Sequence, residues 1–273
     1  MCLTILYIGK DVKTISSGAD VLNKRNIDFL HKLSNNRVDI IEPKKISRLQ
    51  KLLSCRLNGY TKRVEKRILN QLSQKRYTHV FLSQSLLGFV AKAIKRHYPN
   101  ICIICCFHNI EKHFGREMLR VNGIRVLPFY FKACYSEKLI AKYCDKFLFL
   151  NKRDAQRMSC SASIGCIIPI AYADTFNPNK VISPQLQKKE TLEILFVGSD
   201  FFANIEGIRW FIKYVFPYIS GHLTIVGKGM DRYKGEFTSD RISVWGFVSN
   251  LEDFYYDADV VVITDPDGDR LGV

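Results

Sequence analysis

Apolar residues along this chain recur in two alternating patterns. Residues 3–8 form a continuous apolar run that ends at Gly9, and from Val21 to Leu33 the apolar positions recur at steps of three and four residues. Further apolar runs, each separated from the next by a helical pattern, occupy residues 38–41, 80–82, 101–107, 146–150 and 167–170. Buried strands that alternate with amphipathic helices predict an α/β fold, with a parallel sheet covered by helices on both faces.

A polar segment at residues 177–190 interrupts this rhythm and contains Pro178 and Pro184. The strand and helix patterns then begin again, with apolar runs at residues 192–197, 223–226, 242–245 and 259–263. Proline-marked polar segments are typical of linkers. The sequence therefore predicts a Rossmann-like domain over residues 1–176, a linker over 177–190 and a partial second Rossmann-like domain over 191–273.

The chain carries 41 basic and 26 acidic residues, a net charge of +15. Residues 44–76 concentrate this excess, with eleven basic residues against the single acid Glu65, and their apolar positions have helical spacing. Three interpretations fit such a cationic amphipathic stretch: a solvated helix face, contact with an anionic membrane surface, or contact with nucleic acid. Because no nucleic-acid-binding motif accompanies the charge, we expect no nucleic-acid partner.

No apolar run approaches the ~18–20 residues that a membrane-spanning helix needs. The N-terminus also lacks the basic region of a secretory signal. The nine cysteines occupy apolar positions, and strand alternation directs Cys102 and Cys105 to opposite faces, so we expect buried thiols and no metal site. These features predict a cytoplasmic protein. Under the membrane interpretation of residues 44–76, the protein attaches peripherally to the inner face of the cell membrane.

Glycine turns follow the apolar runs of the second half, at Gly198, Gly227 and Gly246. Together with their flanking residues, these turns resemble the retaining glycosyltransferases of family 4, which have the GT-B fold of two Rossmann-like domains. The segments that carry the resemblance, in the family's order, are residues 195–199, 204–211, 223–229, 244–248 and 257–262.

The resemblance implies transfer of a sugar from a nucleoside diphosphate to a hydroxyl acceptor, with retention of the anomeric configuration. It implies a saccharide or lipid-linked acceptor and a role in cell-envelope or capsular polysaccharide synthesis. Neither a metal nor a cofactor other than the nucleotide-sugar donor is expected.

In the first half, candidate site residues follow two predicted strands. Gly18, next to Ser17, can adopt a positive φ and let an anion approach the start of a helix, although a plain loop glycine explains it equally. His108 and Asn109 follow the strand at 101–107, where ligands bind in open α/β sheets, but a structural histidine is the alternative. The resemblance implies that His108 is catalytic and contacts the sugar or the acceptor hydroxyl.

In the second half, the resemblance implies donor contacts at the strand ends, with Lys228 on phosphate and the turn at Gly246 on the base. Tight turns that only reverse the chain are the alternative. The full set of candidates is Gly198, Ser199, Asn204, Gly227, Lys228, Gly246, Phe247, Val248 and Gly268. Ser199 and Asn204 stand where many family members have basic residues.

The family's glutamate-bearing helix has no counterpart in these 273 residues. A second hypothesis is therefore a truncated, inactive glycosyltransferase that retains acceptor or membrane binding. The resemblance implies that the strand at 259–263 lies beside the first strand of its domain. We expect this strand to be buried on both faces but to have a bare outer edge.

Overall fold

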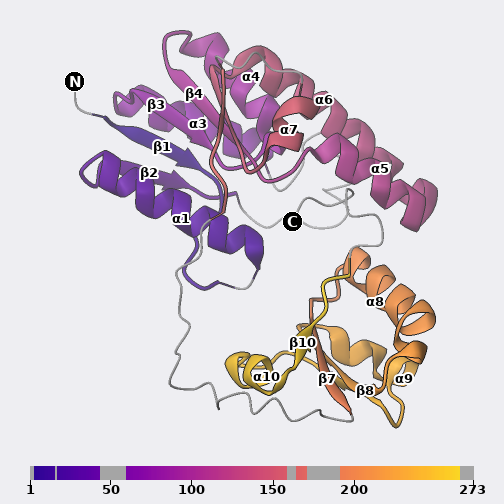
Figure 1. Ribbon diagram of the computed structural model, residues 1–273. Coiled ribbons are helices and arrows are strands. Elements are labelled where there is room, and N and C mark those ends of the chain that lie inside the picture. The colour runs from indigo at the N-terminus through magenta and orange to yellow at the C-terminus, as the bar shows by residue number, and fades with distance from the viewer. Residues whose placement is uncertain (1–2, 16, 44–59, 159–163, 171–190, 265–273) are drawn as a thin grey trace. The chain divides into compact units, whose positions relative to one another are not determined.

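The computed structural model describes residues 3–15, 17–43, 60–158, 164–170 and 191–264. The chain divides into two compact units, Met1–Ala171 and Tyr172–Leu271, and each contains one parallel sheet (Figure 1). The predicted α/β fold with two parallel sheets, the second smaller, is confirmed. The predicted linker at 177–190 lies outside the described residues.

The first sheet has six parallel strands in the order β2-β1-β3-β4-β5-β6. They are β1 (Ile5–Ile8), β2 (Val38–Ile41), β3 (His79–Leu82), β4 (Cys102–Phe107), β5 (Lys146–Phe149) and β6 (Gly165–Ile167). The last strand was expected at residues 167–170 and instead begins at Gly165, which lies close against the Phe149 ring. It ends before Pro169, which has no N–H to extend the ladder.

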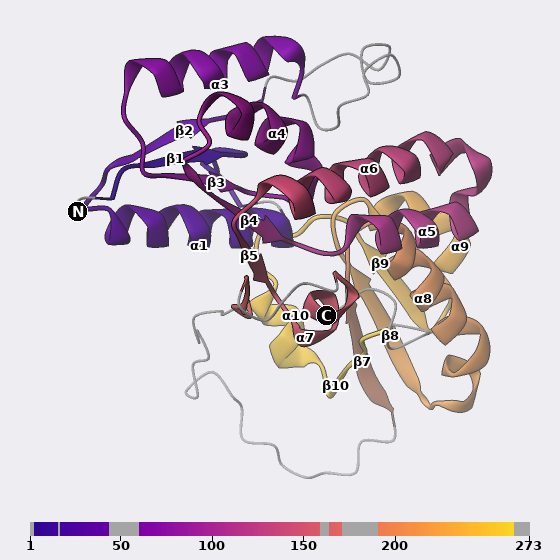
Figure 2. The ribbon, with the colours of Figure 1, turned by 90° about the horizontal axis from the view of Figure 1, so that it is seen from above.

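Helices cover both faces of this sheet, with α1 on one face and α3 and α4 on the other (Figure 2). The helices are α1 (Gly18–Leu33), α3 (Lys62–Gln74), α4 (Gly88–His97), α5 (Glu111–Asn122), α6 (Leu127–Tyr143) and α7 (Lys152–Arg157), with 3₁₀ turns η1 (Ser85–Leu87) and η2 (Gly123–Val126).

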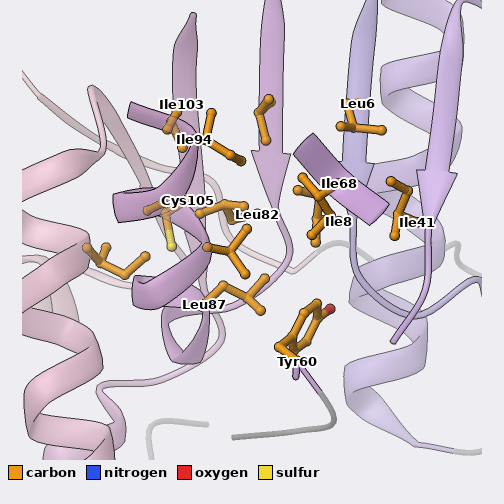
Figure 3. Close-up of a cluster of buried hydrophobic side chains, with 14 of the residues drawn as sticks. Leu6, Ile8, Ile41, Tyr60, Ile68, Leu82, Leu87, Ile94, Ile103 and Cys105 are labelled. Atoms are coloured by element: carbon orange, nitrogen blue, oxygen red, sulfur yellow. The ribbon is translucent and has the colours of Figure 1, made fainter. Parts of the chain in front are cut away.

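Alternate residues of β1 enter the two hydrophobic clusters, as the pleat of a strand requires. Leu6 and Ile8 belong to the cluster on the side of α3 and α4 (Figure 3), whereas Ile5 and Tyr7 pack with residues of α1.

Helix α3 confirms the amphipathic pattern for the described part of residues 44–76. Val64, Ile68 and Leu72 are buried in the core. The exposed basic residues of the stretch are Lys62, Arg63, Lys66, Arg67, Lys75 and Arg76. Residues 44–59, which complete the predicted cationic stretch, lie outside the described part of the chain.

The second unit contains four parallel strands in the order β10-β7-β8-β9. They are β7 (Leu192–Val197), β8 (Gly221–Val226), β9 (Ile242–Trp245) and β10 (Val260–Val261). Between them lie α8 (Phe202–Tyr214), η4 (Phe216–Tyr218), η5 (Met230–Tyr233), α9 (Lys234–Phe237) and α10 (Glu252–Asp257). The apolar face of α8, with Ile205, Ile208 and Phe211, completes the core of this unit.

Strand β10 pairs with β7, with Val260 opposite Ile194, which confirms its expected neighbour. The expectation of burial on both faces is wrong: Val260 and Val261 are 43% and 44% exposed. The reason is position, since β10 is an edge strand of only two residues. Val262, just beyond it, packs against the core.

The described thiols fit the prediction only in part, because Cys105 and Cys106 are buried in β4 whereas Cys166 is exposed. No helix among the described residues is both long and apolar enough to cross a membrane.

Candidate functional site

In the first unit, strands β1 and β3 come very close at their carboxyl ends. A Cβ atom on Gly9 would lie 2.4 Å from Ser83 Oγ, so only glycine fits there. The amide of Ser83 donates to the Ile8 carbonyl at 3.0 Å, which joins the two strand ends. Because the strands are parallel, the loop after β4, with His108, belongs to the same edge of the sheet.

The His108 side chain carries a buried Nε2 atom that has no hydrogen-bond partner among the described residues. Its pKa is lowered to about 4, chiefly by burial and also by the positive charge of Arg25, against the opposing effect of a hydrogen bond to the Ser83 backbone. The imidazole is therefore neutral at neutral pH and can exchange a hydrogen bond with a ligand, but it carries no charge to offset an anion.

Asn109 adds a second buried polar atom, Oδ1, which also lacks a partner within the described part of the chain. Buried polar atoms in folded proteins nearly always have a hydrogen-bond partner, protein or otherwise. Two such atoms on adjacent residues of a strand-end loop indicate a site that a polar ligand or water satisfies.

The loop that carries His108 is held by Glu137 of α6. One carboxylate oxygen of Glu137 accepts the Glu111 amide at 2.6 Å, and the other accepts the Lys112 amide at 3.4 Å. Glu137 thereby caps the first turn of α5, which begins three residues after His108. Nothing in the sequence pattern singled out this residue; its one signal is a carboxylate within an otherwise apolar helix face.

Glu111 and Glu137 form a buried pair of carboxyl groups. Burial, followed by the nearby Glu137 carboxyl, raises the pKa of Glu111 to about 8. Burial also raises the pKa of Glu137 to about 7, against the hydrogen bonds from the Glu111 and Lys112 amides. The support of the His108 loop therefore contains two acids that exchange protons near neutral pH.

At the start of α1, Ser17 is the N-cap, and its Oγ accepts the Asp20 amide at 3.3 Å. The suggestion that Gly18 uses a positive φ is wrong, because its backbone lies outside that region. A Cβ on Gly18 would meet no atom within 4 Å, so the space beside this helix start is open.

In the second unit, the turns that follow β7, β8 and β9 pack on one another. A Cβ on Gly227 would lie 1.8 Å from the Gly198 carbonyl oxygen, and one on Gly246 would lie 3.0 Å from Asp231 Oδ1. The Gly198 amide donates to the Val226 carbonyl at 3.0 Å, and the Gly227 amide donates to the Trp245 carbonyl at 3.2 Å. Gly227 is therefore required for the close approach of the first two turns, and Gly246 lies tightly against the Asp231 side chain.

Side chains fix this surface further. Asn204 Nδ2 donates to the Ser199 carbonyl at 3.0 Å, and Asp200 pairs with Arg232 at 2.7 Å. Helix α8 begins immediately after this turn without a side-chain cap. Uncapped amides at a helix start suit an anion. Lys228 lies near this helix start, because the Asp200 amide donates to the Lys228 carbonyl at 3.0 Å, and its side chain is exposed.

The structure thus gathers five predicted residues, Gly198, Ser199, Asn204, Gly227 and Lys228, on neighbouring turns. Gly246 joins them through Asp231, whereas Phe247 projects into solvent with 76% of its surface exposed and Val248 is half-buried. Gly268 lies outside the described residues.

Comparison with known proteins bears on the second unit directly. Residues 191–266 match the family model described as "Glycosyl transferases group 1". A search of curated proteins finds no match.

Solved structures resemble this chain over 95% of its length. Sucrose-phosphate synthase from Thermosynechococcus elongatus is 15% identical, with a TM-score of 0.71 over 95% of this chain and 75% of that one. The lipopolysaccharide outer core galactosyltransferase WaaB, in its apo form, is 14% identical, with a TM-score of 0.60 over 95% and 73%. Anabaena HepE in complex with UDP and glucose is 12% identical, with a TM-score of 0.56 over 95% and 73%.

These likenesses establish the fold, and the family match concerns the residues that form the glycine turns of the second unit. The chain has the fold of the GT-B glycosyltransferases, and its residues 191–266 match the group 1 glycosyltransferases, which supports a transferase.

Proposed function

We propose that the chain transfers a sugar from a nucleoside diphosphate to a hydroxyl group of a saccharide or lipid-linked acceptor, with retention of the anomeric configuration. The observation that carries this proposal is the set of interlocked glycine turns at Gly198, Gly227 and Gly246, which lie within the segment that matches group 1 glycosyltransferases.

The donor's diphosphate is assigned to the surface made by Ser199, Lys228 and the start of α8. Backbone amides there complement negative charge, and Lys228 supplies a cation. Together they would stabilise the departing nucleoside diphosphate without a metal. The base is assigned to the turn from Gly246 to Val248. Anabaena HepE was solved with UDP and glucose, which is consistent with a nucleotide-sugar donor for this fold.

His108 is assigned to the transferred sugar or to the acceptor hydroxyl. A neutral imidazole with a free buried Nε2 accepts or donates one hydrogen bond to a hydroxyl group, which matches this assignment better than contact with phosphate. Asn109 offers a second hydrogen bond from the same loop, and the open space at Gly18 leaves room for a ligand beside the amides of α1.

The proposed setting is cell-envelope or capsular polysaccharide synthesis at the inner face of the membrane. The exposed basic residues of α3 support it, since each Lys or Arg beside an anionic bilayer contributes ~1 kcal/mol. Binding to phosphatidylglycerol vesicles that weakens as salt is raised tests this part; equal binding to neutral vesicles would reject it.

The experiment that tests the proposed donor site is calorimetric titration of the chain with UDP, GDP and ADP. One of them is expected to bind, and Lys228→Ala is expected to weaken that binding about tenfold. The matched control is Lys234→Ala, which removes an exposed lysine of the same unit and should bind as the unaltered chain does. If none of the three nucleotides binds, the proposed function is wrong.

A second candidate is a chain that binds donor or acceptor without transferring sugar. The exposed valines of the edge strand β10 favour it, because apolar edge residues lower the stability of the unit that holds the donor. The same titration, combined with an assay for hydrolysis of the bound sugar nucleotide, separates the two: binding without turnover supports the second candidate.

A further inference from the structure

The hairpin of α5 and α6 carries apolar side chains that its own unit leaves exposed. The two helices lie side by side and are joined at one end by η2 (Figures 1 and 2). Ile124, in that connection, is 84% exposed, and Phe131 of α6 is 61% exposed. We name as the hairpin surface the exposed apolar residues Val121, Ile124, Leu127, Phe131 and Tyr135.

This surface forms a stripe because Leu127, Phe131 and Tyr135 are four residues apart and share one face of α6. The other faces of α6 are already occupied. Its contact with α5 runs through Gly115, where a Cβ would lie 3.3 Å from the Tyr130 Cα. Ala133, Glu137 and Ile140 of α6 are buried.

The same hairpin exposes basic side chains. Arg125 follows Ile124 directly, Lys138 lies one turn beyond Tyr135, and Arg116 and Arg120 share a face of α5; all four are exposed. Within the described residues, no carboxylate pairs with Arg116 or Arg125.

The acids of the hairpin do not offset this charge at the surface. Glu111 and Glu137 are buried, and Glu117 pairs with Arg120 at 3.0 Å. A hairpin that exposes large apolar residues and cations, without a free surface carboxylate, complements an anionic lipid surface. The apolar residues would enter the acyl boundary and the cations would meet the headgroups.

We infer that the hairpin surface docks the protein onto an anionic bilayer, with Ile124 and Phe131 inserted below the headgroups. This contact is distinct from the one proposed for α3, and it does not depend on sugar transfer. The two differ in kind, since α3 exposes basic residues over a buried apolar face, whereas the hairpin exposes both kinds together.

Sedimentation of the full chain with vesicles of phosphatidylcholine and phosphatidylglycerol tests the inference. The double variant Ile124→Ser and Phe131→Ser is expected to bind at least tenfold more weakly. The variant Arg116→Gln with Arg125→Gln is expected to bind the vesicles about 25-fold more weakly at low salt, since each cation is worth roughly fivefold in the binding constant. The matched control, Tyr218→Ser, removes an 88% exposed ring from the second unit and should change nothing.

Insertion has its own readout. Ile124→Trp is expected to shift its fluorescence emission to the blue and to be quenched by brominated lipids, whereas Tyr218→Trp is expected to do neither. Unchanged vesicle binding by the hairpin variants, or an Ile124→Trp probe that stays in water, overturns the inference. Nucleotide titration of the same variants should be unchanged, so a failure here leaves the proposed donor site standing.

Discussion

The two units have the same strand-helix plan but build the candidate sites at their strand ends in different ways. The first uses buried side chains: a neutral His108 and the carboxyl pair of Glu111 and Glu137. The second uses backbone, with turns that interlock because Gly227 has no side chain to collide with the Gly198 carbonyl. Side chains can be tuned through their pKa, whereas backbone turns are fixed by steric contact, so the two units should respond to different perturbations.

The largest effect is expected from Gly227→Ala. Its new methyl group would lie 1.8 Å from a backbone carbonyl oxygen, which no side-chain rotation relieves. We expect a loss of at least ~3 kcal/mol in the unfolding free energy of the second unit. Both tryptophans, Trp210 and Trp245, belong to that unit, so fluorescence during urea unfolding reports on it alone.

Gly235→Ala is the control for this prediction, because a Cβ there meets no atom within 4 Å. It should leave the urea midpoint unchanged or raise it slightly. If Gly227→Ala behaves in the same way, the interlocking of the turns does not determine the stability of this unit.

The next largest effect is expected from His108→Gln on sugar transfer. Glutamine retains a polar end but not the imidazole that the proposed function assigns to the ligand, and loss of such a group costs about 100-fold in turnover. The unfolding free energy at pH 7.5 should change by less than ~1 kcal/mol. His113→Gln, on the neighbouring helix, is the control. Full activity of His108→Gln would show that His108 is structural.

A smaller and pH-dependent effect is expected from Glu111→Gln. The folded pKa of about 8 lies above the ordinary value of 4.5, so the carboxyl favours folding when protonated and loses that advantage as pH rises from about 4.5 through 8. We compare the unfolding free energy of the variant with that of the unaltered chain. This difference should be on the order of 2 kcal/mol more favourable to the variant at pH 8.5 than at pH 4.5. Thermal unfolding at both values measures this difference.

If the unfolding free energies of Glu111→Gln and of the unaltered chain change with pH in parallel, Glu111 is not held protonated by its surroundings.

The smallest effect on stability is expected from Gly18→Ala. The added methyl group meets no protein atom within 4 Å, so the unfolding free energy should change by less than ~0.5 kcal/mol. Turnover should nevertheless fall several-fold, because the open space beside α1 is assigned to a ligand. Unaltered turnover at unaltered stability would remove Gly18 from the site.

The fold could be predicted from the sequence because it depends on hydrophobic periodicity, which is local. The alternation of runs and helical patterns correctly predicted the parallel strands, whereas the pairing of β10 with β7 was implied by the family resemblance. The register of β6 and the exposure of Val260 could not be predicted in this way. They depend on which residues from distant parts of the chain lie alongside, such as Phe149 against Gly165.

The candidate site could be predicted less completely. Strand-end glycines are visible in the sequence, but the collision that makes Gly227 obligatory involves a residue 29 positions away, and only the folded turns bring it there. Glu137 has no motif at all, because its role as the cap of α5 arises from the packing of two helices. The roles of His108 and the second-unit candidates in catalysis and binding remain predictions.

The strand order of the second sheet has a consequence for how the protein is made. Strands β7, β8 and β9 lie in the sheet in the order in which they are synthesised. Strand β10, the last along the described chain, returns to the open edge of β7, and the Glu193 amide donates a hydrogen bond to the Asp259 carboxylate, 66 residues away. On the ribosome, at ~5–20 residues per second, β7 therefore keeps an unpaired edge for roughly one to three seconds after Trp245 is added. During this interval the nascent chain exposes a template for strand addition, so its yield in the cell should depend on chaperones that shield that edge.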